Sequence, residues 1–137
     1  MSAPVNPPAF GSPEDWLRHA ASDLHLAGIA LPDAEVLRNQ VAFHAQQAAE
    51  KSLKAVLVAR KIHFPRTHDL EALIEMIQLA GLTWPFAPAE IESLTPFAVE
   101  TRYPGGFAQV TNSEAEEAIH AARCVLKWAR GVVSPVS

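Results

Sequence analysis

The chain has 137 residues, of which 49% are hydrophobic and 19% are charged, and its formal net charge is −4. These values fit one globular domain with a real hydrophobic core, and they exclude an intrinsically disordered chain. The negative charge excludes bulk electrostatic attraction to nucleic acid, so any such binding must depend on a local basic patch.

Residues 1–11 are predicted to form a flexible tail, because three of them are prolines and no helical pattern is present. The chain starts with neither a basic segment nor an apolar core, so it is not expected to begin with a signal peptide. No apolar run is long enough to span a bilayer. We therefore expect a cytoplasmic protein with no membrane partner.

Two amphipathic helices are predicted in the first half of the chain. The first begins with Ser12 as N-cap and Pro13 at the first helical position, and it ends near Gly28. The second extends from about Ala34 to Lys61, because no glycine or proline interrupts its helical pattern.

A third helix is predicted to begin at Thr67, acting as N-cap, and to end at Gly81. A fourth helix is predicted to start near Pro88. Pro96 removes a backbone donor, so this helix must kink or restart there before it ends ahead of Pro104.

The fifth predicted helix opens with a capping box at residues 113–116, headed by Ser113, and its apolar stripe continues to Ala129. Cys124 lies on this helix, and we expect it to be a buried structural thiol. As the single cysteine it excludes an internal disulfide and a cysteine zinc site. Residues 132–137 are predicted to be a second flexible tail.

No alternating strand pattern of any length is present. Five amphipathic helices with short connections predict an all-α fold, an up-and-down bundle in one domain that spans residues 12–131.

The second helix carries a polar row on one side and an alanine-rich apolar side. The row spans about 120° of the helix and includes an i,i+4 pair of Glu50 with Lys54. We expect the alanine side to face the bundle and the row to stay free. A solvated face and a working surface continued by Arg66 and His68 both fit this pattern. The row consists of Gln40, Phe43, His44, Gln47, Glu50, Lys51 and Lys54.

Three segments, FHAQQAAEKSLKAVL, PRTHDL and ETRYPGG, occur in an order that resembles the HEPN domain family. The resemblance covers the chain from about Trp16 to Lys127. It implies a helical bundle that forms homodimers through helix-lined faces, with the activity located in the cleft between the two subunits. Small HEPN proteins of this kind are often the toxin of a toxin–antitoxin pair whose antitoxin is a minimal nucleotidyltransferase, which makes that enzyme the expected partner.

The resemblance also implies a site that binds a nucleotide or an RNA phosphate. We expect no cofactor and no metal. A non-enzymatic helical module that recognises a nucleotide or a protein is the alternative. The residues we assign to phosphate binding form a basic and polar set: Gln47, Lys51, Lys54, Arg66, His68 and Tyr103.

A third possibility is a metal-independent endoribonuclease, since many HEPN proteins carry an Arg-x(4–6)-His motif late in the chain. Arginine clamps phosphate, and histidine moves protons near neutral pH. Here no histidine follows Arg102 at that spacing, so Arg102 with His44 is the candidate catalytic pair. Arg38 and His44 match the motif formally. They lie about 120° and about 9 Å apart on one helix, which favours an accidental match.

Two further patterns have a structural and a functional interpretation. His68 either hydrogen-bonds locally at a helix start or joins Arg66 in an anion site. Glu117 and His120 have the Glu-x-x-His spacing of di-iron bundles, but no second copy exists, which favours an ordinary surface pair.

Overall fold

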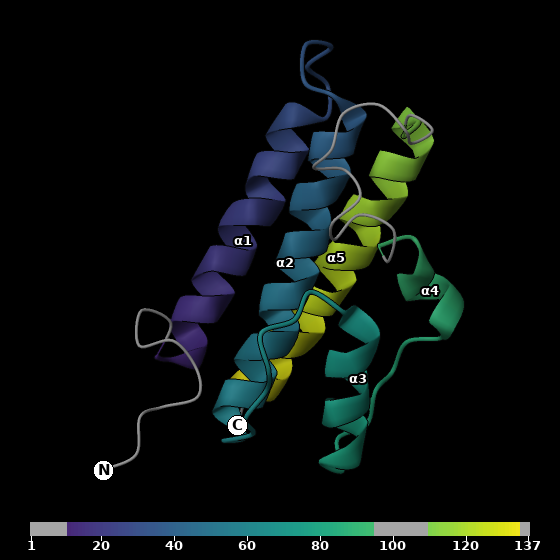
Figure 1. Cartoon of the computed structure of the whole chain (residues 1–137). Coiled ribbons are helices and arrows are strands. Elements are labelled where there is room, and N and C mark those ends of the chain that lie inside the picture. Colours follow the sequence, from purple (N-terminus) through teal and green to yellow (C-terminus); the bar gives the residue numbers. More distant parts are fainter. Residues whose placement is uncertain (1–10, 95–109, 135–137) are drawn as a thin grey trace.

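A computed structural model describes residues 11–94 and 110–134, and these ranges contain only helices and loops (Figure 1). The predicted all-α bundle is confirmed. None of the helices in these ranges is both long enough and apolar enough to cross a bilayer. The helices are α1 (Pro13–Ala30), α2 (Arg38–Ala59), α3 (Leu70–Leu79), α4 (Pro88–Glu92) and α5 (Asn112–Val133).

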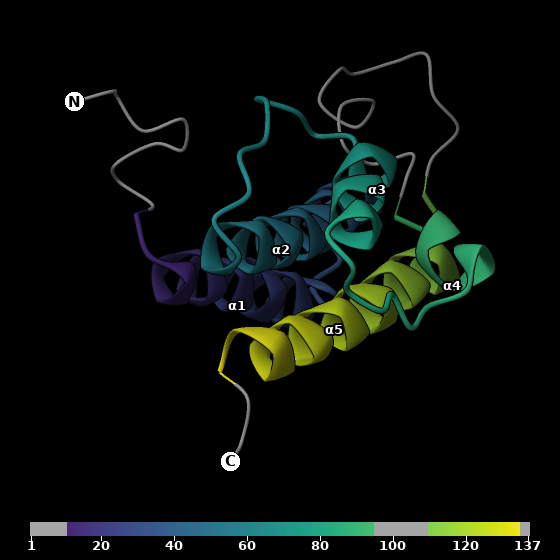
Figure 2. The ribbon, with the colours of Figure 1, turned by 90° about the horizontal axis from the view of Figure 1, so that it is seen from below.

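Three long helices, α1, α2 and α5, lie side by side and form the body of the bundle (Figure 1). The middle helix, α2, packs against α1, α5 and α3. The view from below shows α3 on the outer side of α2, away from the seam between α1 and α5 (Figure 2). Because α2 has neighbours on most of its sides, its sequence must satisfy both apolar and polar contacts.

The alanine side of α2 faces the bundle as predicted. Val41, Ala45, Ala48 and Ala55 are fully buried. Side chains this small let neighbouring helices approach closely, and Leu53 and Leu57 fill the remaining core volume.

The start of α2 lies later than predicted, at Arg38 instead of Ala34. Residues 31–37 form turns in which the Asp33 side chain accepts a hydrogen bond from the Glu35 backbone N–H. Asp33 therefore shapes the connection and does not cap the helix. At the other end α2 stops at Ala59, and Lys61 adopts a left-handed backbone with φ of 59°.

The N-caps of α3 and α5 also differ from the predicted residues. Asp69, not Thr67, caps α3, because its carboxylate accepts hydrogen bonds from the Glu71 and Ala72 backbone N–H groups. In α5 the capping box joins Thr111 to Glu114, so the cap precedes Ser113.

Hydrogen bonding within the α5 capping box affects Glu114. Hydrogen bonds with Thr111 hold the pKa of the Glu114 carboxyl below its ordinary value. The bond with the Thr111 backbone N–H has the larger effect, and the bond with the Thr111 side chain has the smaller one. The charged form that caps α5 is therefore favoured.

The last turn of α5 continues to Val133, past the predicted start of a tail at residue 132. Several predicted features lie outside the described residues. They are the remainder of the two tails, the restart of the fourth helix after Pro96, and the candidate site residues Arg102 and Tyr103.

Candidate functional site

The polar row of α2 is partly covered, and the prediction that the whole row stays free is wrong. Glu50 and Lys54 are only 2% and 8% exposed, and Gln46, which lies outside the predicted row, is fully buried. α1 flanks α2, and the segment that leads into α3 contacts it through His68, so the row meets protein where we expected solvent. We name the resulting cluster the α2 strip: Asp23, His44, Gln46, Gln47, Glu50, Lys51, Lys54 and His68.

Asp23 of α1 organises one half of the α2 strip. One carboxylate oxygen lies 3.4 Å from Nδ1 of His44, and the other lies 2.6 Å from Nζ of Lys51. The Asp23 side chain is 16% exposed, whereas the His44 side chain is 31% exposed. Asp23 thus holds an imidazole and an ammonium group that both keep a solvent-facing part.

Glu50 organises the other half. Its two oxygens lie 2.9 Å from Nδ1 of His68 and 2.9 Å from Nζ of Lys54. The Gln46 amide donates to the same carboxylate and to the His68 carbonyl, each over 3.4 Å. The predicted pair of Glu50 with Lys54 is therefore present, but it lies in the interior.

Lys54 is a buried structural cation. Its ammonium group lies 5.7 Å from the ring centroids of both Trp16 and Phe64, a separation at which a cation is attracted to an aromatic face. With Glu50 on the same group, Lys54 has no open side toward a ligand. We therefore remove it from the residues proposed to contact phosphate.

Each histidine of the α2 strip is held by a carboxylate at Nδ1, which leaves Nε2 as the other ring nitrogen. Such a bond sets the ring orientation and decides which nitrogen exchanges a proton. The His68 side chain is 46% exposed. The strip therefore presents two oriented imidazoles that can accept or donate a proton at Nε2.

Two more of the predicted residues belong to this cluster or lie close to it in the chain. Gln47 is partly exposed and donates to the Gln46 side chain over 2.9 Å. Arg66 is exposed two residues before His68 and forms no ion pair within the described part of the chain.

Arg38 is committed to the connection between α1 and α2. Its guanidinium donates to the Asn112 side chain and to four backbone carbonyls, those of Ala30, Leu31, Asp33 and Val36. These bonds support the interpretation that its spacing from His44 is accidental.

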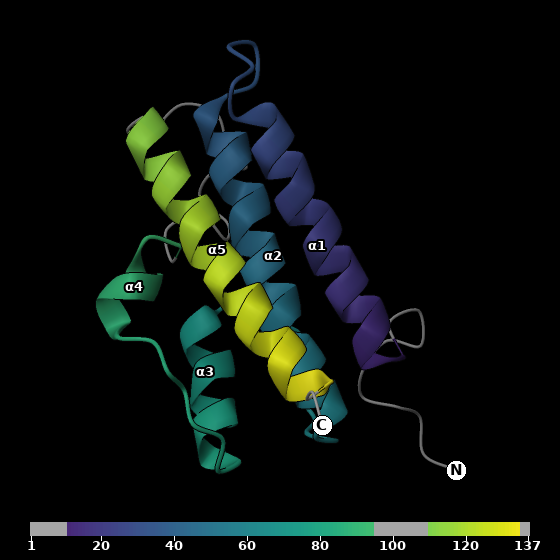
Figure 3. The same ribbon diagram turned by 180° about the vertical axis from the view of Figure 1, so that it is seen from behind.

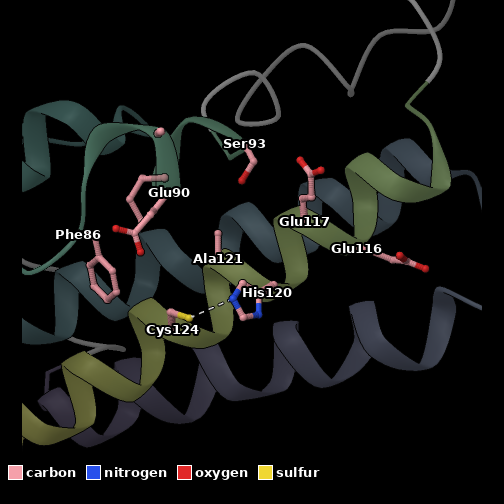
Figure 4. A pocket seen from close by; sticks show the side chains of 10 residues that line it. Phe86, Glu90, Ser93, Glu116, Glu117, His120, Ala121 and Cys124 are labelled. Atoms are coloured by element: carbon pink, nitrogen blue, oxygen red, sulfur yellow. Dashed lines mark hydrogen bonds between the residues drawn. The ribbon is translucent and has the colours of Figure 1, made fainter.

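A separate pocket of about 400 Å³ lies between α4 and α5 (Figure 4). Its lining includes Glu90, Glu116 and Glu117, and it also includes His120, whose Nε2 lies 3.7 Å from Sγ of Cys124. Three carboxylates disfavour a phosphate here. Cys124 is partly exposed in this pocket, so the expectation that its thiol is buried is wrong.

The described ranges contain no group of three or more His, Cys, Asp or Glu side chains that could hold a metal ion. Glu117 and His120, which have the Glu-x-x-His spacing, are both exposed residues of α5.

A family model for the HEPN domain matches residues 13–132, a range that extends from α1 to α5. The chain belongs to the HEPN family. The sequence resemblance is thereby confirmed, and the α2 strip is a feature of a HEPN domain.

Two crystal structures share this HEPN fold. ST0689, an archaeal HEPN homologue, is 28% identical, with 90% of this chain and 98% of that chain covered and a TM-score of 0.65. TT1696 from Thermus thermophilus is also 28% identical, with 89% and 98% covered and a TM-score of 0.69. A comparison with curated proteins gives no match.

Sequence reasoning missed Asp23, the residue that orients His44 in this HEPN domain. Asp23 lies directly before the buried Leu24 in a helix whose apolar residues mark only one face. An acid beside that face was the available signal, but nothing in the spacing connects it to His44, which is 21 residues away.

Proposed function

We propose that this HEPN protein is the toxin of a toxin–antitoxin pair that acts in the cytoplasm, and that it binds a nucleotide or RNA phosphate at the α2 strip. The observation that carries this proposal is the pair of carboxylate-held imidazoles along α2, His44 with Asp23 and His68 with Glu50. The expected partner is a minimal nucleotidyltransferase.

The exposed groups of the α2 strip suit an anion. Arg66, which lies beside the strip, supplies positive charge, and Lys51 and the imidazoles donate hydrogen bonds to phosphate oxygens. The two carboxylates of the strip already have cationic or imidazole partners, so their charge is largely offset. The described lining of the pocket between α4 and α5 has no such compensation, which makes the α2 strip the better phosphate site.

We further propose that two copies pair so that the α2 strip lines a cleft between them. In this arrangement Arg102 and Tyr103, which lie outside the described residues, complete the site. An arginine that clamps the phosphate would then stabilise the negative charge that develops on it in the transition state.

A metal-independent endoribonuclease is the second candidate, and the two oriented imidazoles favour it. One imidazole accepts the 2′-hydroxyl proton while that oxygen attacks phosphorus. The other donates a proton to the departing 5′ oxygen. The products are a 2′,3′-cyclic phosphate and a free 5′-hydroxyl, so protons balance without a metal.

Phosphate binding is tested by thermal unfolding with ATP as the probe. Saturation at about 100 times Kd should stabilise the protein by about 2.7 kcal/mol. Lys51→Ala should remove most of this gain, because it deletes a charged donor and leaves Asp23 facing the ligand. Arg66→Ala should also weaken it.

Lys61→Ala is the matched control, since it removes an exposed lysine that lies outside the α2 strip. This variant should be stabilised by ATP as much as the unaltered protein. A full stabilisation in Lys51→Ala, or an equal loss in Lys61→Ala, would contradict a phosphate site at Lys51.

The biological role is tested by expressing the chain alone and with a minimal nucleotidyltransferase. Expression alone should arrest growth, and the partner should restore it. Light scattering should show a dimer. Normal growth at high expression would argue against a toxin, and a strict monomer would leave no cleft between subunits.

A further inference from the structure

We infer that a groove between α1 and α5, on the other side of the bundle from α3, binds the phosphate backbone of a single-stranded nucleic acid. The groove has a volume of about 570 Å³, and the seam that holds it is seen from behind in Figure 3. Its described lining shares no residue with the α2 strip. That lining includes Arg123, Lys127 and Arg130 from α5 and His25 from α1.

The three cations form one row. They occupy positions i, i+4 and i+7 of α5, so they fall within about 60° around the helix and span about 10.5 Å along it. All three are exposed. Within the described part of the chain, no carboxylate lines the groove and none of the three cations has an ion pair. In contrast, Lys51 and Lys54 are both neutralised by carboxylates.

A favourable interaction of the three cations with the dipole of α5 does not explain the row. A cation interacts favourably with the dipole only within the last turn of a helix. Of the three, Arg130 alone lies there. Arg123 and Lys127 are too far from Val133, so their charge is available to an external anion.

The apolar part of the lining argues against a partner helix as the occupant. Leu24 and Leu126 are only 8% and 3% exposed, so a helix docked on them would bury little further apolar area. Ile29 is the one lining residue in the described ranges with a large exposed apolar side chain, at 60%.

A second copy is disfavoured as well. A two-fold interface brings the same patch of both copies together, which would place Arg123 and Lys127 against like charges. Among the residues that the structure describes, no aromatic side chain lines the groove for base stacking. Binding should therefore follow the backbone charge and be insensitive to base sequence.

The inference shares only its ligand class with the proposed function. It is tested by fluorescence anisotropy with a labelled single-stranded RNA of about 12 nucleotides. Three phosphate contacts predict a slope of log K against log salt of about −2, from about 0.7 per contact. Arg123→Gln/Lys127→Gln should reduce the slope by about 1.4 and, at about 0.1 M salt, lower affinity about 25-fold.

Arg60→Gln/Lys61→Gln is the matched control, because it also removes one exposed arginine and one exposed lysine from a different part of the surface. It should change affinity much less than the groove variant. DNA of the same length should bind like RNA. Equal losses in the two variants would indicate bulk charge and overturn the inference.

Two further results would also overturn it. The first is an absence of binding by the unaltered protein. The second is competition by a poly-glutamate peptide as strong as that of RNA, which would indicate an acidic protein partner. The two variants separate the two proposals, since Lys51→Ala should remove most of the ATP stabilisation, whereas Arg123→Gln/Lys127→Gln should leave it unchanged.

Discussion

Glu50→Ala should destabilise the domain by about 3–5 kcal/mol, because it leaves a buried lysine without its counter-charge. Glu50 is 2% exposed and bonds to Lys54, which is itself 8% exposed between two aromatic rings. His68 and Gln46 would lose an acceptor at the same time. The free energy of unfolding, measured in urea, gives the size of the effect.

The double variant Glu50→Leu/Lys54→Met separates charge from shape. It removes both charges and keeps apolar volume, so it should be far less destabilised than Glu50→Ala alone. Glu71→Ala serves as control, since Glu71 is exposed and its loss should change stability by about 0.5 kcal/mol or less. A loss below about 1 kcal/mol in Glu50→Ala would contradict a buried ion pair at this position.

His68→Ala should lower metal-independent RNA cleavage by about 10²–10⁴-fold, the usual contribution of one general acid or base. The reason is geometric, since His68 is the exposed imidazole that Glu50 holds at Nδ1 over 2.9 Å. His44→Ala should have an effect of similar size through the pair with Asp23. Cleavage of a labelled RNA in excess EDTA measures both.

His63→Ala is the matched control for these variants. His63 is also exposed and belongs to the same segment between α2 and α3, but it has no carboxylate contact among the described residues. Its replacement should leave cleavage unchanged. Thermal unfolding must show that His68→Ala is folded, and His68→Gln keeps a polar side chain if it is not. If His68→Ala and His44→Ala both cleave RNA as fast as His63→Ala and the unaltered protein, the two imidazoles have no catalytic role.

The two predictions meet at Glu50, which both stabilises the interior and orients His68. Glu50→Gln tests whether these roles separate. It keeps the shape of the side chain but leaves Lys54 without its counter-charge, so we expect a smaller loss of stability than in Glu50→Ala. Slower RNA cleavage by the folded variant would identify Glu50 as a positioning residue, and unaltered cleavage would restrict its role to stability.

The sequence alone determined the all-α fold, the general course of the helices and the family. These features depend on local signals: helical periodicity, prolines and glycines at boundaries, and motifs in a fixed order. The caps at Asp69 and Thr111 were missed by two residues each, because several adjacent side chains are capable of capping and small differences in backbone geometry select one.

Tertiary structure alone decided what the polar row of α2 touches. Periodicity defines the faces of a helix but not the neighbour that covers each face, and that depends on contacts between residues far apart in the chain. Asp23 reaches Lys51 from 28 residues away, and His68 reaches Glu50 from 18 residues away. The same side chains that the sequence presents as a solvated row therefore become buried or half-buried ion pairs and oriented imidazoles, because packing removes water and protein groups replace it as partners.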